Sequence, residues 1–190
     1  MSNLKAIVRT YIAQIRPRAQ AELDWFRKQL TLNSAIELAA LAINSEGKRY
    51  CHQRRLKREN LERAKTVLLA NSDFIRKCGS FDELFTLIEM TLQEIGGIGE
   101  LYIYDTALRI GANLSLSPGK VYLHTGTRVG AKALGLDGKL KTLDIAALPI
   151  ELHQLEPHEI EDVLCIFKSE LSEETTGVSE KNISKQSWCS

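Results

Sequence analysis

Four residues near the middle of the chain, residues 96–99 with the sequence Gly-Gly-Ile-Gly, constrain the fold most strongly. They separate two long apolar stretches, which begin at Phe81 and at Leu101. Glycine adopts positive φ and lets backbones approach closely, so Gly97 and Gly99 predict a sharp corner between two helices. The first amides of the second helix lack partners within that helix, and such a corner binds phosphate groups well. A tight turn between two packed helices explains the same glycines.

A basic segment, defined here as residues 48–58, is the second informative feature. It contains no acidic side chain and six cationic ones, namely Lys48, Arg49, Arg54, Arg55, Lys57 and Arg58. Tyr50 adds a ring that is suited to stacking on a base, so the segment predicts contact with nucleic acid. The alternative is a solvated helix start balanced by neighbouring glutamates. A membrane contact fits less well, because bulky apolar residues are nearly absent from the segment.

The charge, length and apolar content of the chain exclude several classes of protein. The net charge of +1 excludes a uniformly basic chain, and the stretch 151–174 is rich in acids. The charges are therefore separated along the chain. A length of 190 residues with 44% hydrophobic residues permits one substantial core. We find no signal-peptide core and no apolar span of about 20 residues, which predicts a cytoplasmic protein without a membrane partner.

Apolar residues recur at helical spacing through most of the chain and predict an all-α fold. We expect a single helical domain over residues 1–171, with N-terminal helices in 1–79 and the glycine-containing half in 80–171. A disordered tail is expected over 172–190, where little can be buried.

Local signals place several helix boundaries. Pro17 is expected to end the first helix, because proline cannot donate to the helical hydrogen-bond ladder. Ser80 and Glu83 form a capping-box sequence, and Ser117 with Pro118 predicts another helix start.

Two stretches of the second half resemble motifs of the helix-hairpin-helix DNA glycosylase superfamily. Its members join a hairpin of the type L-P-G-V-G to a later stretch of the type V-D-T-H-V-x-R-V-x-x-R-L-G-L. Residues 95–99 match the hairpin, and residues 121–136 match the later stretch with small insertions. The resemblance covers residues 80–136 and implies a helical fold whose hairpin amides hold the DNA backbone. Arg128, within the later stretch, joins the candidate contacts to nucleic acid.

The departures from the superfamily concern its chemistry. Tyr122 stands where the superfamily has its catalytic aspartate, and Leu101 stands where bifunctional members have a lysine. Neither side chain can activate a water or form a Schiff base at neutral pH. The resemblance thus implies a phosphate-binding fold without glycosylase activity.

His124 and Asp105 are the weak catalytic candidates. A histidine and a carboxylate brought together act as acid and base, so hydrolysis of a nucleic-acid or nucleotide phosphate is an alternative function. A buried hydrogen-bonded pair without a catalytic role explains the same residues. We favour a protein that is not an enzyme.

No metal or cofactor motif is evident in the sequence. The four cysteines form no C-x-x-C pair, and His153 and His158 are five residues apart, so they diverge on a helix. Residues 96–99 follow a helix and lack the lysine and hydroxyl of a phosphate-binding loop. We therefore expect no metal and no cofactor.

These features together predict a protein that binds the backbone of nucleic acid, with DNA favoured, through the glycine corner and the basic segment. A module that docks an acidic protein partner on the same basic surface is a further alternative.

Overall fold

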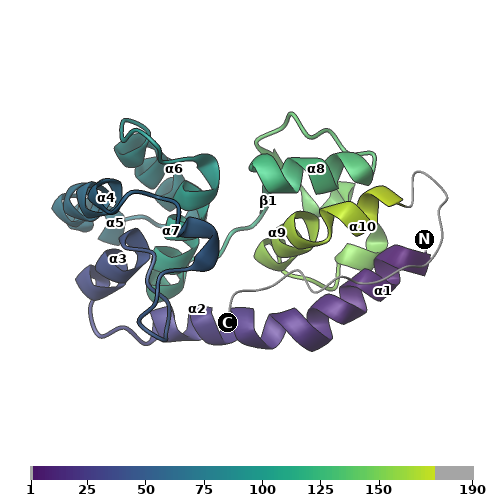
Figure 1. Cartoon of the computed structure of the whole chain (residues 1–190), viewed down its shortest axis with the longest axis horizontal. Coiled ribbons are helices and arrows are strands. Elements are labelled where there is room, and N and C mark those ends of the chain that lie inside the picture. Colours follow the sequence, from purple (N-terminus) through teal and green to yellow (C-terminus); the bar gives the residue numbers. More distant parts are fainter. Residues whose placement is uncertain (1, 174–190) are drawn as a thin grey trace. The chain divides into compact units, whose positions relative to one another are not determined.

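The computed structural model describes residues 2–173 and confirms a mostly helical chain, to which a small two-stranded sheet is added (Figure 1). The described residues form two compact units. The terminal unit combines residues 2–19 with 118–173, and the central unit comprises residues 20–117. These units differ from the predicted halves, 1–79 and 80–171, because the first helix packs with the C-terminal helices.

The secondary structure divides between the two units. The terminal unit contains α1 (Ser2–Thr10), η1 (Tyr11–Ile15), the start of α2 (Arg16–Arg27), β1 (Val121–Tyr122), α8 (Thr125–Ala133), β2 (Thr142–Leu143), η3 (Ile145–Ala147), η4 (Ile150–Leu152), α9 (Pro157–Ile166) and α10 (Lys168–Glu173). The central unit contains the rest of α2, α3 (Leu32–Ala40), η2 (Cys51–Gln53), α4 (Arg58–Ala70), α5 (Ser72–Arg76), α6 (Phe81–Leu92) and α7 (Glu100–Leu114).

The prediction that Pro17 ends the first helix is wrong. Helix α1, the π-helical turn η1 and helix α2 follow one another without a break. In a regular α-helix the proline ring clashes with the carbonyl four residues earlier. A π-helical turn widens the helix, and η1 ends at Ile15, two residues before the proline, so it includes the residue four positions earlier. The local widening therefore explains why the helix continues.

Helix α1 and η1 bury one face in the core of the terminal unit. The buried residues on this face recur at helical spacing and are Leu4, Ile7, Val8 and Tyr11. Polar contacts hold the same elements to the C-terminal helices, since Asn3 Nδ2 donates to the Glu170 carbonyl at 3.2 Å and Arg16 Nη2 donates to Glu159 Oε2 at 2.7 Å. Residues distant in sequence thus share one core.

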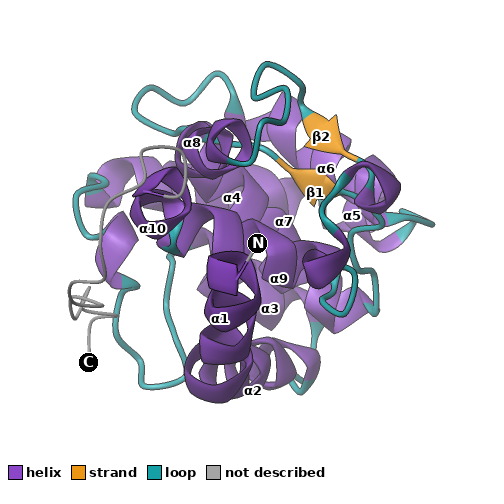
Figure 2. Cartoon of the chain, turned by 90° about the vertical axis from the view of Figure 1, so that its right-hand side faces the viewer, coloured by secondary structure: helices purple, strands orange, loops and turns teal. Residues whose placement is uncertain are grey.

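The predicted helix start at Ser117 and Pro118 is also wrong. The chain continues into strand β1, which pairs antiparallel with β2 so that Val121 lies opposite Leu143. Figure 2 shows the two strands side by side. Buried β-branched and aromatic residues in β1 suit a strand. Helix α8 begins only after His124, its N-cap.

The C-terminal helical region contains two helices, α9 and α10. The predicted tail, residues 172–190, begins inside α10, and its residues 174–190 lie outside the described part of the chain.

Glycines allow α8 and α9 to pack closely. A Cβ added to Gly130 would lie 2.1 Å from the Leu164 carbonyl oxygen of α9, and a Cβ added to Gly126 would lie 2.8 Å from Cys165 Sγ. Both distances are shorter than van der Waals contact. At Gly130 the neighbouring atoms are backbone, so only glycine fits there, whereas at Gly126 the Cys165 side chain would have to shift.

Helix α6 confirms the predicted cap in the central unit. Ser80 Oγ accepts from the Glu83 amide at 3.2 Å, while Glu83 Oε2 accepts from the Gly79 amide at 2.8 Å. The apolar face of α6 is buried as its periodicity predicted, with Phe81, Leu84, Phe85, Ile88 and Leu92. This helix leads directly into residues 96–99.

Candidate functional site

Residues 96–99, hereafter the glycine corner, connect α6 to α7, as the sequence predicted. Gly97 has a φ of +81°, a conformation that favours glycine. Gly99 is the N-cap of α7 in extended conformation, and no side chain caps this helix. Both glycines are exposed. The first turn of α7 therefore begins at an exposed backbone corner.

A side chain from α4 fastens the glycine corner in place. Asn60 Nδ2 donates to the Gly96 carbonyl at 2.6 Å, and a Cβ added to Gly97 would lie 3.1 Å from that nitrogen. Asn60 belongs to the first turn of α4, whose N-cap is Lys57. The end of the basic segment and the glycine corner are consequently neighbours.

Several cations of the basic segment already have partners in the central unit. Lys48 pairs with Glu46 at 3.0 Å, and Arg49 Nη1 donates to the Leu56 carbonyl at 3.1 Å. On α4, Lys57 pairs with Glu59 at 3.6 Å and Arg58 with Glu62 at 3.7 Å. Three of these four cations are therefore balanced by glutamates, as the alternative interpretation of the basic segment predicted, and the fourth, Arg49, bonds to a backbone carbonyl.

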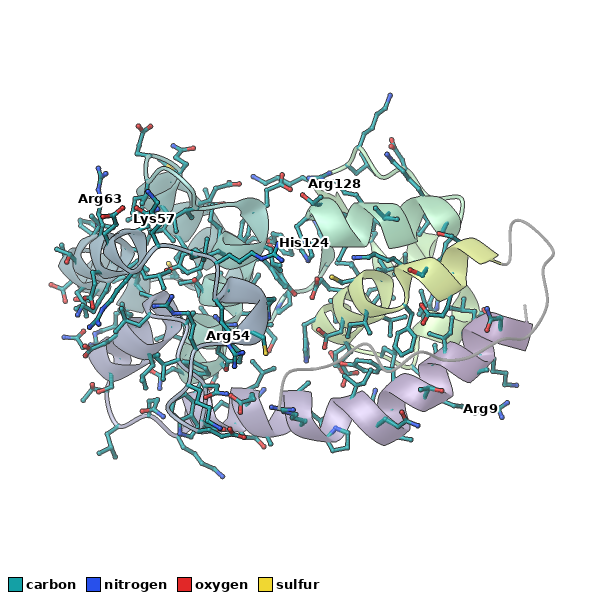
Figure 3. The ribbon with its side chains drawn as sticks, in the orientation of Figure 1. Arg9, Arg54, Lys57, Arg63, His124 and Arg128 are labelled. Atoms are coloured by element: carbon teal, nitrogen blue, oxygen red, sulfur yellow. The ribbon has the colours of Figure 1, made fainter. Side chains whose placement is uncertain are left out.

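Arg54 and Arg55 differ from those four. Both side chains are exposed, and within the described chain neither has an ion-pair partner. They lie in the turn between η2 and α4, and Figure 3 labels Arg54 there, with Lys57 and Arg63 on the α4 side. These two arginines are the cations that remain available to a ligand.

Tyr50 takes part in packing within the central unit. Its hydroxyl donates to Glu22 Oε2 at 2.7 Å, and the guanidinium carbon of Arg109 lies 3.9 Å from the ring centroid. Burial raises the pKa of Tyr50, and the bond to Glu22 raises it further, against the opposing charge of Arg109. Arg109 therefore covers one face of the Tyr50 ring, and that face is not open to stacking by a nucleic-acid base.

Asp105 gathers three donors around one carboxylate oxygen. Oδ2 lies 2.8 Å from His52 Nε2, 2.6 Å from Gln53 Nε2 and 3.2 Å from Arg109 Nη2. Arg109 Nη1 donates in turn to Gln53 Oε1 at 3.0 Å, which closes the network. This arrangement orients the half-exposed imidazole of His52 and links η2 to α7.

His124 lies at the N-terminal end of α8 in the terminal unit (Figure 3). Its Nε2 hydrogen-bonds with Glu161 Oε1, and its Nδ1 accepts from the Gly126 amide at 3.3 Å. Thr127 completes the cap, since the His124 amide donates to Thr127 Oγ1 at 2.7 Å. His124 and Asp105 thus have partners within different units, and their catalytic pairing stays a prediction.

A third residue joins the His124 cluster. Donor atoms of His124, Glu161 and Cys165 lie within 4.8 Å of one another. His124 and Glu161 are buried, and Cys165 is half-buried and not part of a disulfide. The sequence analysis did not anticipate this cluster, because β1 and α8 separate His124 from α9. The one local signal was the i, i+4 spacing of Glu161 and Cys165 on a helix.

Arg128 is held within the terminal unit. Its Nη1 donates to the carbonyls of Gly138 at 3.2 Å and Leu140 at 2.8 Å, which fastens the loop after α8. The glycine corner belongs to the central unit, so these two candidate contacts lie in different units.

Wider comparisons add no functional assignment. None of the helices in residues 2–173 has the length and apolar composition that crossing a bilayer requires. No protein-family model, curated protein or solved structure matches the chain. The geometry of the described residues therefore carries the functional argument.

Proposed function

We propose that the central unit binds the phosphate backbone of nucleic acid, DNA in particular, through the surface where the basic segment meets the glycine corner. The observation that carries this proposal is the hydrogen bond from Asn60 to the Gly96 carbonyl, 2.6 Å long. It fastens the glycine corner to the first turn of α4, which begins where the basic segment ends, although Asn60 and Gly96 are 36 residues apart.

Two kinds of phosphate donor belong to the central unit. Arg54 and Arg55 offer exposed guanidinium groups, which bind phosphate oxygens in a bidentate manner. The glycine corner offers exposed backbone at the start of α7, where the helix dipole favours an anion. Lys57 and Arg58 add to these, because exposed ion pairs are weak and their cations exchange partners at little cost.

The proposed contacts read the backbone and not the bases. Guanidinium and amide contacts to phosphate position a duplex without carrying sequence information. Tyr50, which was expected to stack on a base, is held by Arg109 and Glu22 and is left out of the proposed surface. We expect similar affinity for unrelated sequences and no base excision, since Tyr122 and Leu101 replace the glycosylase residues.

The test is a binding titration of labelled duplex and single strands across a salt series. Counterion release predicts a log–log slope of about −0.9 per phosphate contact on duplex. Replacing Arg54 and Arg55 with alanine should flatten the slope by about one to two units and weaken binding to all sequences alike.

The matched control removes the same charge from the other unit. Lys5 and Arg9 of α1 are exposed and, within the described chain, have no ion-pair partner. The double variant Lys5→Ala, Arg9→Ala should keep the wild-type slope. Wild-type protein that binds neither strand form at low salt would refute the proposal and favour an acidic protein partner.

A further inference from the structure

We propose that His124, Glu161 and Cys165 of the terminal unit bind a zinc ion. This inference is independent of nucleic-acid binding, because it concerns other residues in the other unit. Nitrogen, oxygen and sulfur donors from two helical segments converge, and all three donor atoms lie within 4.8 Å of one another.

The donor set matches the chemistry of zinc. Zinc is bound by histidine nitrogen, carboxylate oxygen and cysteine sulfur at about 2.0 to 2.3 Å, in tetrahedral geometry. Two donors on one such ion lie about 3.5 Å apart. The hydrogen-bonded His124 Nε2 and Glu161 Oε1 must therefore move apart by about 1 Å to admit the ion, and donor pairs that are as much as 4.8 Å apart must approach each other by a similar amount. Three protein donors leave the fourth position for water or a ligand.

Burial and charge favour a cation at this position. The side chains of His124 and Glu161 are only 3% and 7% exposed. A buried carboxylate requires compensating charge, and beside it lies a thiol, which ionises to a second anion. A divalent ion compensates both acids.

The backbone around the cluster is arranged for this purpose. Glu161 and Cys165 are four residues apart on α9 and so share one helix face. His124 is the N-cap of α8, whose first turn contacts the thiol at Gly126. When Nε2 binds the ion, the imidazole proton resides on Nδ1, and the hydrogen bond from the Gly126 amide to Nδ1 is given up. A helix N-terminus stabilises a neighbouring thiolate, which is the form that binds metal.

The same three residues resemble a nucleophilic cysteine with its base, and packing separates the two interpretations. A nucleophile needs room for a substrate to approach sulfur. Here a Cβ on Gly126 would already lie 2.8 Å from Cys165 Sγ, so α8 covers that side of the thiol. An ion needs only the space among the three donors.

Cobalt titration of the full chain tests the proposal, because cobalt(II) replaces zinc and gives a near-ultraviolet charge-transfer band when thiolate binds it. Chelator-treated, reduced protein should bind one cobalt ion with this band, and zinc should displace it. Cys165→Ser should abolish the band and weaken zinc binding by about 100-fold.

Further variants separate ligand loss from structural damage. His124→Asn keeps an oxygen that caps α8 but removes Nε2, and Glu161→Gln keeps the shape of the side chain. Both should weaken zinc binding by at least about tenfold while helical content is retained. Cys78→Ser removes a thiol of the central unit and should bind zinc like the wild type.

Two results would overturn the proposal. One is a wild-type protein without the charge-transfer band. The other is Cys165→Ser with wild-type zinc affinity. Thiol alkylation supplies an independent readout: zinc should slow the modification of Cys165 and leave that of Cys78 unchanged, and equal rates with and without zinc count against the site.

Discussion

Each unit contains a histidine paired with a carboxylate. The two pairs differ in the third group that lies next to the carboxylate. In the central unit, Asp105 lies 3.2 Å from the guanidinium of Arg109, and the paired His52 is 45% exposed. In the terminal unit, the histidine paired with Glu161 is only 3% exposed, and the third group is the Cys165 thiol. The central pair carries its own cation, whereas the terminal cluster combines two acids with one imidazole. The same pair of residue types thus serves as a structural tie in one unit and as a candidate ion site in the other.

The largest effect is expected from the contact that brings the terminal cluster together. Gly130→Ala places a Cβ 2.1 Å from the Leu164 carbonyl of α9, which is backbone and cannot rotate away. Helices α8 and α9 must separate, so we expect a loss of about 3 kcal/mol in the free energy of unfolding. Urea denaturation followed by circular dichroism measures it.

Gly119→Ala is the matched control in the same unit. A Cβ at Gly119 meets no atom within 4 Å, so stability should stay within about 0.5 kcal/mol of the wild type. Equal effects of the two substitutions would contradict the close packing of α8 on α9.

The second largest effect on stability is expected from breaking the ion pair between Arg109 and Asp105 in the central unit. Arg109→Met keeps most of the packing volume but leaves Asp105 without its guanidinium. Removing one partner of a largely buried ion pair costs more than a surface pair does, and we expect about 2 kcal/mol. The free energy of unfolding again provides the measurement.

Arg63→Met is the comparison for Arg109→Met. Arg63 is exposed on α4 and, within residues 2–173, has no ion-pair partner. Its replacement should leave stability nearly unchanged. If Arg109→Met costs no more than Arg63→Met, the role of Arg109 as the cation that balances Asp105 is wrong.

The smallest effect comes from a buried phenol and depends on pH. Tyr102 donates to the Ala40 carbonyl at 2.5 Å, and burial raises its pKa from 10.0 to about 12. A raised folded-state pKa contributes stability that is complete below pH 10 and is lost as pH rises through about 12. Tyr102→Phe should therefore be less stable by about 1 kcal/mol at neutral pH, and this deficit should shrink above pH 10.

Thermal unfolding of both proteins across the alkaline range measures this difference, and tyrosinate absorbance reports the ionisation. A deficit that stays constant from neutral to alkaline pH would show that the buried hydroxyl of Tyr102 does not ionise on unfolding.

Local sequence signals were sufficient where neighbouring residues decide the structure. The Ser80 cap, the apolar face of α6 and the glycine corner were predicted because each depends on residues within two turns of one another. The predictions from Pro17 and Pro118 were wrong for different reasons. A π-helical turn accommodates Pro17 within a continuing helix, and the residues after Pro118 pair as a strand instead of starting a helix.

The candidate sites also differ in whether local sequence or tertiary contacts define them. Arg54, Arg55, Gly97 and Gly99 were found from composition and backbone conformation, which the chain carries locally. The partners of His124 were not, since Glu161 is 37 residues away and reaches it only when glycines let α8 pack on α9. The sequence by itself determined the mostly helical character of the chain, helix α6, the glycine corner and the basic segment. Tertiary packing alone decided which acids face which histidines, because contacts between distant segments depend on how whole helices fit together.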